Sequence, residues 1–188
     1  MRIPPAVRAA LFALLAAIVC LFAFEADADP MVPGPFTLKQ TDGATVDGAE
    51  LDGKPYGVMF GFTHCPDICP TALAELSTAL AAAPDLRKDF RVYFVSVDPE
   101  RDTPQALGAY VGAFDPRVVG LTGAPEDIAT ATQAFGAVAR KVPTKSGGYT
   151  MDHTAALYLV DANGIIVDRV SFKEPADVMA KRIAAAAR

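Results

Sequence analysis

Cysteine, histidine and positive charge are all scarce in this sequence. Its 188 residues include three cysteines, two histidines, and 17 basic against 22 acidic residues, which gives a formal net charge of −5. Nucleic-acid binding depends on clustered Lys and Arg, so this composition argues against a nucleic-acid partner. A domain of this size buries enough apolar surface to fold without a disulfide, which disfavours a purely structural disulfide.

The longest uncharged run lies near the N-terminus, between Arg2 and Arg8 on one side and the acidic segment 25–29 on the other. A basic start, an apolar stretch and a polar exit indicate a signal peptide or a signal anchor. The 16 residues of the run, 9–24, are long for a signal peptide, so we favour an anchor retained in the membrane. Cys20 lies inside this run, and we interpret it as an inert membrane residue.

The chain then divides into three parts. Residues 1–28 form the anchor or signal peptide, and residues 29–35, with three prolines, form a linker. Residues 36–188 form one domain that lies outside the cytoplasm in either case. Without Arg2 and Arg8, the exported part carries a net charge near −7.

Residues 36–188 alternate between patterns typical of strands and of helices. Turn signals at Asp42-Gly43 and Asp47-Gly48 indicate a small N-terminal β-hairpin over 36–51, and Asn163-Gly164 indicates a second hairpin. The expected strands cover 57–62, 91–97, 118–121, 155–160 and 165–170. The expected helices cover 71–83, 104–114, a segment from Pro125 and a segment after Pro175.

Two further expectations concern the chain after residue 125. The apolar spacing predicts that the helix starting there buries Ile128, Ala131, Phe135 and Val138. Residues 140–150 contain Pro143 and a Gly-Gly pair, and we expect a protruding hairpin or loop.

The order of these elements predicts the fold. A strand, a helix and a strand within about 40 residues form a βαβ unit with a parallel pair, and the hairpin at Asn163-Gly164 adds an antiparallel pair. A mixed sheet of this kind, flanked by helices, is the thioredoxin-like α/β arrangement. We therefore expect this fold, with an N-terminal β-hairpin and an inserted loop or hairpin near 140–150.

Cys65 and Cys69 follow the first core strand directly, at the edge where open α/β sheets place their sites. Residues four apart on a helix share a side, and a helix N-terminus favours thiolate over thiol. Such a pair exchanges electrons as a disulfide or binds a soft metal ion. The spacing is one residue longer than the usual redox Cys-x-x-Cys, so the pattern alone leaves both uses open.

The two histidines are not equally suited to be metal ligands. His64 adjoins Cys65, and we expect its side chain to point away from the thiols. His153 precedes the strand 155–160, whose entry lies beside the cysteine turn on this fold. Two thiolates and one imidazole would suit Cu(I) and also Cu(II), whereas structural zinc usually takes a fourth protein ligand. A lone histidine at a strand entrance is more often a surface or core residue, so chemistry alone leaves this role open.

Four neighbouring residues receive simpler interpretations. We assign Met59 to core packing and treat Met151 as a weak thioether candidate. Asp67 is expected to cap the helix that follows. Asp152 adjoins His153, and adjacent residues of an extended chain point in opposite directions, so no orienting role is assigned to it.

Four segments resemble the motifs of the SCO/SenC family. Residues 61–70 read GFTHCPDICP and match its signature, and residues 95–104, VSVDPERDTP, match its second motif. The third and fourth matches are GLTG at 120–123 and DHT at 152–154. The resemblance runs in the family's order from Phe36 to the C-terminus.

The resemblance implies a membrane-tethered, thioredoxin-like copper protein that serves cytochrome c oxidase assembly. It implies metal ligation by Cys65, Cys69 and His153, and delivery of Cu(I) or Cu(II) to the oxidase subunit that holds the dinuclear copper centre. Other periplasmic copper chaperones or thiol reductants are further expected partners. The expected location is the inner membrane with the domain in the periplasm, or the periplasm itself after cleavage.

The resemblance also leaves two alternatives to a metallochaperone. The dithiol could serve a thiol-disulfide reductase that acts on the cysteines of the oxidase copper site, or a redox or copper sensor. His153 separates the first alternative from the chaperone, because metal binding needs it and dithiol exchange does not.

Overall fold

The computed structural model describes residues 31–83, 85–145 and 147–188. The anchor or signal peptide expected at 1–28, and Cys20 within it, lie outside these ranges. Within them, no helix is both long enough and apolar enough to span a bilayer.

The main sheet contains seven strands in the order β2-β1-β5-β4-β3-β8-β9. Strands β3 and β4 are parallel, as are β4 and β5, whereas β8 runs antiparallel to both β3 and β9. The expected mixed sheet is therefore confirmed. Its strands are β1 (Thr37–Gln40), β2 (Thr45–Asp47), β3 (Tyr56–Gly61), β4 (Arg91–Ser96), β5 (Val118–Thr122), β8 (Leu157–Val160) and β9 (Ile166–Val170).

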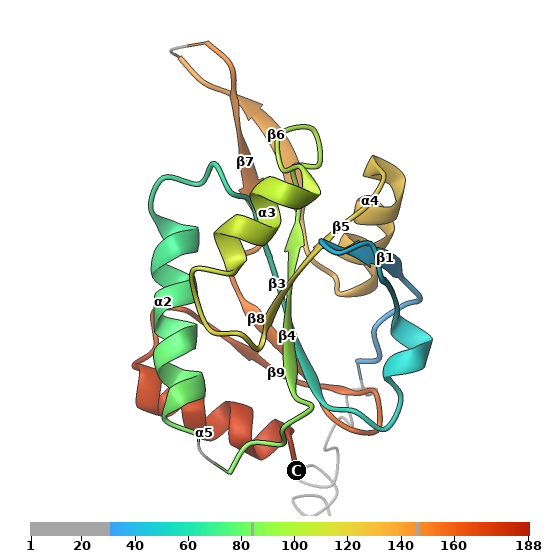
Figure 1. The fold of residues 1–188 in the computed structure, drawn as a ribbon, viewed down its shortest axis with the longest axis vertical. Coiled ribbons are helices and arrows are strands. Elements are labelled where there is room, and N and C mark those ends of the chain that lie inside the picture. The colour runs from blue at the N-terminus through green and yellow to red at the C-terminus, as the bar shows by residue number, and fades with distance from the viewer. Residues whose placement is uncertain (1–30, 84, 146) are drawn as a thin grey trace, which may run out of the picture.

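Helices cover both faces of this sheet (Figure 1). Side chains alternate along β3, so Met59 packs in the core cluster with residues of α2, α3 and α5, while Val58 and Phe60 pack in the cluster that contains Ile128 of α4. Met59 is 1% exposed, which confirms its assignment to the core. The helices are α2 (Ile68–Ala81), α3 (Pro104–Val111), α4 (Pro125–Ala134) and α5 (Ala176–Ala186), with a short 3-10 helix, η1, at Gly48–Leu51.

The two outlying hairpins differ in how they join the core. The N-terminal hairpin is confirmed, and β1 also pairs with β5, so the hairpin extends the main sheet. The segment near 140–150 forms a second hairpin, β6 (Ala139–Pro143) with β7 (Tyr149–His153), which is a separate two-stranded sheet. It projects beyond the carboxyl end of β4 (Figure 1).

Two helix expectations need correction. Helix α2 begins at Ile68 rather than at Thr71, so Cys69 lies in its first turn, where Pro70 is tolerated. Helix α4 ends at Ala134, and the chain turns at Gly136, whose φ is 59°. Val138 therefore leaves the helical face and is 59% exposed, whereas Ile128, Ala131 and Phe135 are buried as expected.

Candidate functional site

The two cysteines lie between the end of β3 and the first turn of α2. The Cys69 amide donates a hydrogen bond to the Cys65 sulfur at 3.3 Å, and both thiols are free. Cys65 is half-buried and Cys69 is only 2% exposed. The Cys65 sulfur therefore lies at the N-terminus of α2, with a backbone N–H directed at it.

Cys69 has the opposite environment. Burial raises the pKa of its thiol to about 12, and a hydrogen bond to the Phe62 backbone offsets only part of this effect. The sulfur is therefore protonated at neutral pH in this state. A bound soft cation would displace that proton, because thiolates rather than thiols are metal ligands.

Gly61 leaves room for the Cys69 sulfur at the end of β3. A Cβ atom at this position would lie 3.3 Å from that sulfur and 2.5 Å from the buried ring of Phe94. The backbone conformation at Gly61 is ordinary, so the requirement for glycine is one of space.

The ring of His153 meets the cysteine turn from the end of β7. Its Nε2 lies 3.7 Å from the Cys69 sulfur, and its ring packs edge-on against Phe62 with centroids 5.8 Å apart. Its Nδ1 lies 3.2 Å from the Thr154 carbonyl oxygen, which can only accept, so Nδ1 carries the proton and the Nε2 lone pair faces the Cys69 thiol. Burial lowers the pKa of His153, which favours the neutral, ligand-ready ring.

His64 belongs to a different set of contacts. Its ring lies 3.0 Å from the Thr63 hydroxyl and 3.5 Å from the Asp102 carboxyl, and its side chain is 51% exposed. The expectation that it is not oriented towards the thiols fits these contacts. Asp102 did not stand out in the sequence. Its position after β4, at the same sheet edge as the cysteines, could have indicated that it lies near the site.

The other residues near the cysteines and His153 have different environments. Asp67 occupies the N-cap position of α2, but its side chain makes no capping hydrogen bond, so the predicted cap is wrong. Asp152 pairs with Arg140 at 2.6 Å on the exposed side of the hairpin. Met151 is half-buried and lines a cavity of about 300 Å³ together with Cys65 and His153.

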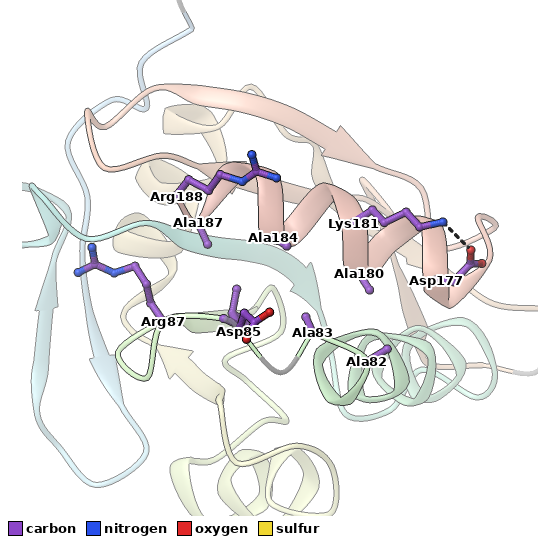
Figure 2. Close-up of a pocket in the computed structure, with 11 residues that line it drawn as sticks. Ala82, Ala83, Asp85, Arg87, Asp177, Ala180, Lys181, Ala184, Ala187 and Arg188 are labelled. Atoms are coloured by element: carbon purple, nitrogen blue, oxygen red, sulfur yellow. Dashed lines mark hydrogen bonds and ion pairs between the residues drawn. The ribbon is translucent and has the colours of Figure 1, made fainter.

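A larger cavity, of about 700 Å³, lies elsewhere between α5 and the segment that follows α2 (Figure 2). Its lining combines alanines with charged side chains such as Asp177 and Lys181, and it includes no cysteine or histidine. Cys69 lies at the opposite end of α2, about 20 Å away at 1.5 Å per helical residue. The size of a cavity therefore does not identify the reactive site here.

Sequence reasoning correctly predicted that Cys69 and His153 meet. Among the described residues, however, no three His, Cys, Asp or Glu side chains form a ready-made metal cage. The structure thus contains two adjacent donor atoms, on Cys69 and His153, with Cys65 beside them and partly open to solvent.

Comparison with known proteins agrees with the motifs. The family model described as SCO1/SenC matches residues 25–188. The chain belongs to the SCO1/SenC family. SCO1 homolog 1 of Arabidopsis thaliana, a mitochondrial protein, is 40% identical over 130 residues, and the human mitochondrial SCO1 homolog is 34% identical over 142 residues. These matches cover 69% and 74% of this chain but only 39% and 47% of those relatives.

Solved structures of SCO1/SenC proteins share the fold. Copper-bound ScoI of Bradyrhizobium japonicum is 42% identical with a TM-score of 0.75, over 82% of this chain and 99% of that one. BsSco, in which a disulfide switch was identified, is described as a member of the Sco family of cytochrome c oxidase assembly proteins. It is 27% identical with a TM-score of 0.65, over 85% and 96% of the two chains. The thioredoxin-like α/β fold expected from the sequence is confirmed.

Proposed function

We propose that this protein is a copper chaperone that binds copper through Cys65, Cys69 and His153. It delivers the ion for assembly of the dinuclear copper centre of cytochrome c oxidase. The observation that carries the proposal is the 3.7 Å approach of the neutral His153 Nε2 to the Cys69 sulfur. Support also comes from the copper-bound Bradyrhizobium relative and from the oxidase-assembly role of the Sco family named for BsSco.

The spacing of these two atoms fits a shared ion. With metal–sulfur and metal–nitrogen bonds of about 2.3 and 2.0 Å, two ligands of one tetrahedral or trigonal ion lie roughly 3.5–3.7 Å apart. The observed separation is at the upper end of this range. Thiolate and imidazole together suit Cu(I) and tolerate Cu(II).

Loading would require a change at Cys65. Its sulfur accepts a hydrogen bond from the Cys69 amide, and no three-donor cage exists among the described residues. A rotation of the half-exposed Cys65 side chain towards Cys69 and His153 would complete the donor set. The Cys69 proton leaves as copper binds, and a recipient with well-matched soft ligands takes the ion by stepwise ligand exchange.

Cu(I) titration of the reduced protein, in competition with a coloured chelator, tests this function. Replacing Cys65 or Cys69 by Ser should abolish tight binding. His153→Ala should weaken binding at least roughly tenfold, the cost of disturbing even an outer partner of a metal ligand. His64→Ala is the matched control and should bind as the wild type does. Stoichiometric tight binding by the double cysteine variant would refute the ligand assignment.

One observation favours a second candidate function, a thiol-disulfide reductase. The two free thiols lie next to each other at a helix N-terminus of a thioredoxin-like fold. The dithiol would pass two electrons and two protons to a partner disulfide, such as that of the oxidase copper site, and become a disulfide itself. Dithiol exchange that survives His153→Ala while copper binding is lost would separate the two activities.

We further propose that the domain faces the periplasm and is tethered through residues 1–28. The support is the basic start, apolar run and acidic exit of that segment. Fractionation of cells that express the full chain, with protease treatment of spheroplasts, tests this. A protein protected from protease in intact spheroplasts would contradict the orientation.

A further inference from the structure

The β6–β7 hairpin that carries His153 has little of its own to hold it in place. Among the described residues it pairs only with itself, and neither strand contains a fully buried residue. An isolated two-stranded hairpin is at best marginally stable in water. The hydrogen bonds between Val138 and Thr154 close its base without fixing the direction in which it projects. The position of His153 therefore depends on contacts with the rest of the domain.

The loop after β4 supplies contacts at the far end of β7. The buried carboxyl of Asp98 accepts a hydrogen bond from the Tyr149 hydroxyl at 2.9 Å and pairs with the Arg101 guanidinium. Arg101 also donates to the Tyr149 carbonyl at 3.1 Å, and its guanidinium lies 3.9 Å from the centroid of the Tyr149 ring. Tyr149 is thus bound through its hydroxyl, its ring and its backbone.

The same loop also contacts β6 and Phe62, whose ring packs against His153. Lys141 of β6 donates to both carboxylate oxygens of Glu100, at 2.6 and 2.7 Å. The Arg101 guanidinium lies 5.8 Å from the ring of Phe62, and that ring packs against His153. The Lys141 pair is exposed and contributes little on its own, so the stronger contacts are those of Asp98 and Arg101.

Asp102, at the end of this loop, forms hydrogen bonds with the cysteine turn. Asp102, which is 1% exposed, accepts hydrogen bonds from the Thr63 amide at 2.9 Å, the Thr63 hydroxyl at 2.6 Å and the Ser96 hydroxyl at 2.7 Å. Thr63 stands two residues before Cys65. One short segment therefore binds both parts of the chain that carry the candidate ligands.

We propose that residues 98–102 form a positioning bracket that sets the separation between the Cys69 sulfur and the His153 ring. Asp102 fixes the cysteine turn, while Asp98 and Arg101 fix β7 through Tyr149. The consequence for copper rests on the proposed function, whereas the consequence for the hairpin does not. The bracket also gives a role to the VDPERDTP segment, which lies outside the proposed ligand set.

Two variants remove the hairpin side of the bracket without touching a ligand. Tyr149→Phe removes only the hydroxyl bound to Asp98, and Arg101→Met removes the guanidinium. Arg140→Ala is the control, because the side-chain hydrogen bonds of Arg140 among the described residues go to Asp152, on the exposed side of the same hairpin, and not to the bracket. The first readout is amide hydrogen exchange of residues 139–153 in the reduced, metal-free protein.

We expect Arg101→Met to speed exchange in the hairpin roughly tenfold or more, because hydrogen bonds to a charged group are lost, and Tyr149→Phe to have a smaller effect of the same kind. Exchange in β3 should stay unchanged, and Arg140→Ala should change the hairpin less than about twofold. Hairpin exchange that is unchanged in both variants would overturn the bracket. An equal response to Arg140→Ala would overturn it as well.

The second readout is Cu(I) affinity, with the Cu(II) absorption and electron paramagnetic resonance spectra of the same variants. Arg101→Met should weaken Cu(I) roughly tenfold and alter the nitrogen-ligand signature, because the imidazole loses its fixed position. If His153→Ala binds copper as the wild type does, the proposed ligand set fails, and the exchange data still decide the bracket. Normal copper affinity and spectra in Arg101→Met, with His153→Ala impaired, would overturn the bracket alone.

Discussion

The cysteine turn and the β6–β7 hairpin meet at one site but are built in different ways. The turn follows a strand whose six residues are all buried and which pairs with β4 and β8 on both sides. The hairpin has no partner strand in the main sheet within the part of the chain that the structure describes. The cysteine turn is thus supported by the sheet and by the buried Asp102, whereas the hairpin that carries the imidazole is supported by side-chain contacts with the loop after β4. This difference predicts that damage to the turn affects the whole domain and that damage to the hairpin stays local.

The largest expected effect comes from Asp102→Ala on the cysteine side. Three donors would lose their acceptor: the Ser96 hydroxyl, which is buried, and the amide and hydroxyl of Thr63, which are half-buried. Unsatisfied buried donors are costly, so the free energy of unfolding should fall by about 3 kcal/mol or more. Urea unfolding followed by circular dichroism measures this. Asp177→Ala, at an exposed pair with Lys181, is the control and should cost at most about 0.5 kcal/mol.

Gly61→Ala should have the next largest effect. The added methyl group would meet the buried Phe94 ring and crowd the Cys69 sulfur. Overpacking of this kind should lower the free energy of unfolding by about 1–3 kcal/mol. For Gly57→Ala on the same strand, the nearest atoms to the added methyl group are methyl groups of Leu157 and Val92, at 3.0 Å or more, so this variant should cost less. Equal losses in the two variants would argue against a tight fit at Gly61.

The two thiols should differ in reactivity. The thiolate is the reactive form, and burial raises the pKa of Cys69 to about 12 while Cys65 is partly exposed. Iodoacetamide at pH near 8 should therefore modify Cys65 at least about tenfold faster than Cys69, as mass spectrometry of the reduced protein would report. In guanidinium the two rates should converge. A faster reaction at Cys69 in the native protein would reverse the assigned environments.

The smallest expected effect concerns pH and the hairpin. Burial lowers the pKa of His153, so below the ordinary histidine value of about 6.5 the unfolded chain binds a proton that the folded chain resists. Above that pH this histidine therefore does not change the free energy of unfolding. Below it, the free energy of unfolding falls as pH decreases, by less than about 1.4 kcal/mol per pH unit.

The acid sensitivity is measured as the free energy of unfolding at several pH values between about 7.5 and 5.5, which span the ordinary histidine pKa. The difference between wild type and His153→Gln isolates the contribution of this ring. Acid sensitivity that is the same in both proteins would show that other groups cause it.

Short-range sequence patterns, such as apolar runs, turn residues and helical spacing, were sufficient to predict most of the fold. The buried run of β3, the turn at Asn163-Gly164 and the apolar spacing of Leu73, Leu76 and Leu80 each determine structure through near neighbours. The placement of Cys65 and Cys69 followed from the same logic, because parallel strands bring active residues to one edge.

Contacts between distant side chains were harder to predict. Asp98, Arg101 and Tyr149 meet only because the hairpin folds back over the loop after β4, and no spacing rule encodes that approach. The expected cap at Asp67 is wrong, because capping depends on side-chain direction as well as residue type. Val138 was misplaced because the chain leaves the helical path at Gly136.

The two sulfurs of the site differ in exposure, because Cys65 is partly open to solvent and Cys69 is buried. An approaching protein would touch Cys65 first, while Cys69 stays under the hairpin beside His153. Under the proposed function, ligand exchange at the site should therefore be ordered, with Cys65 exchanging first and Cys69 and His153 releasing the ion last.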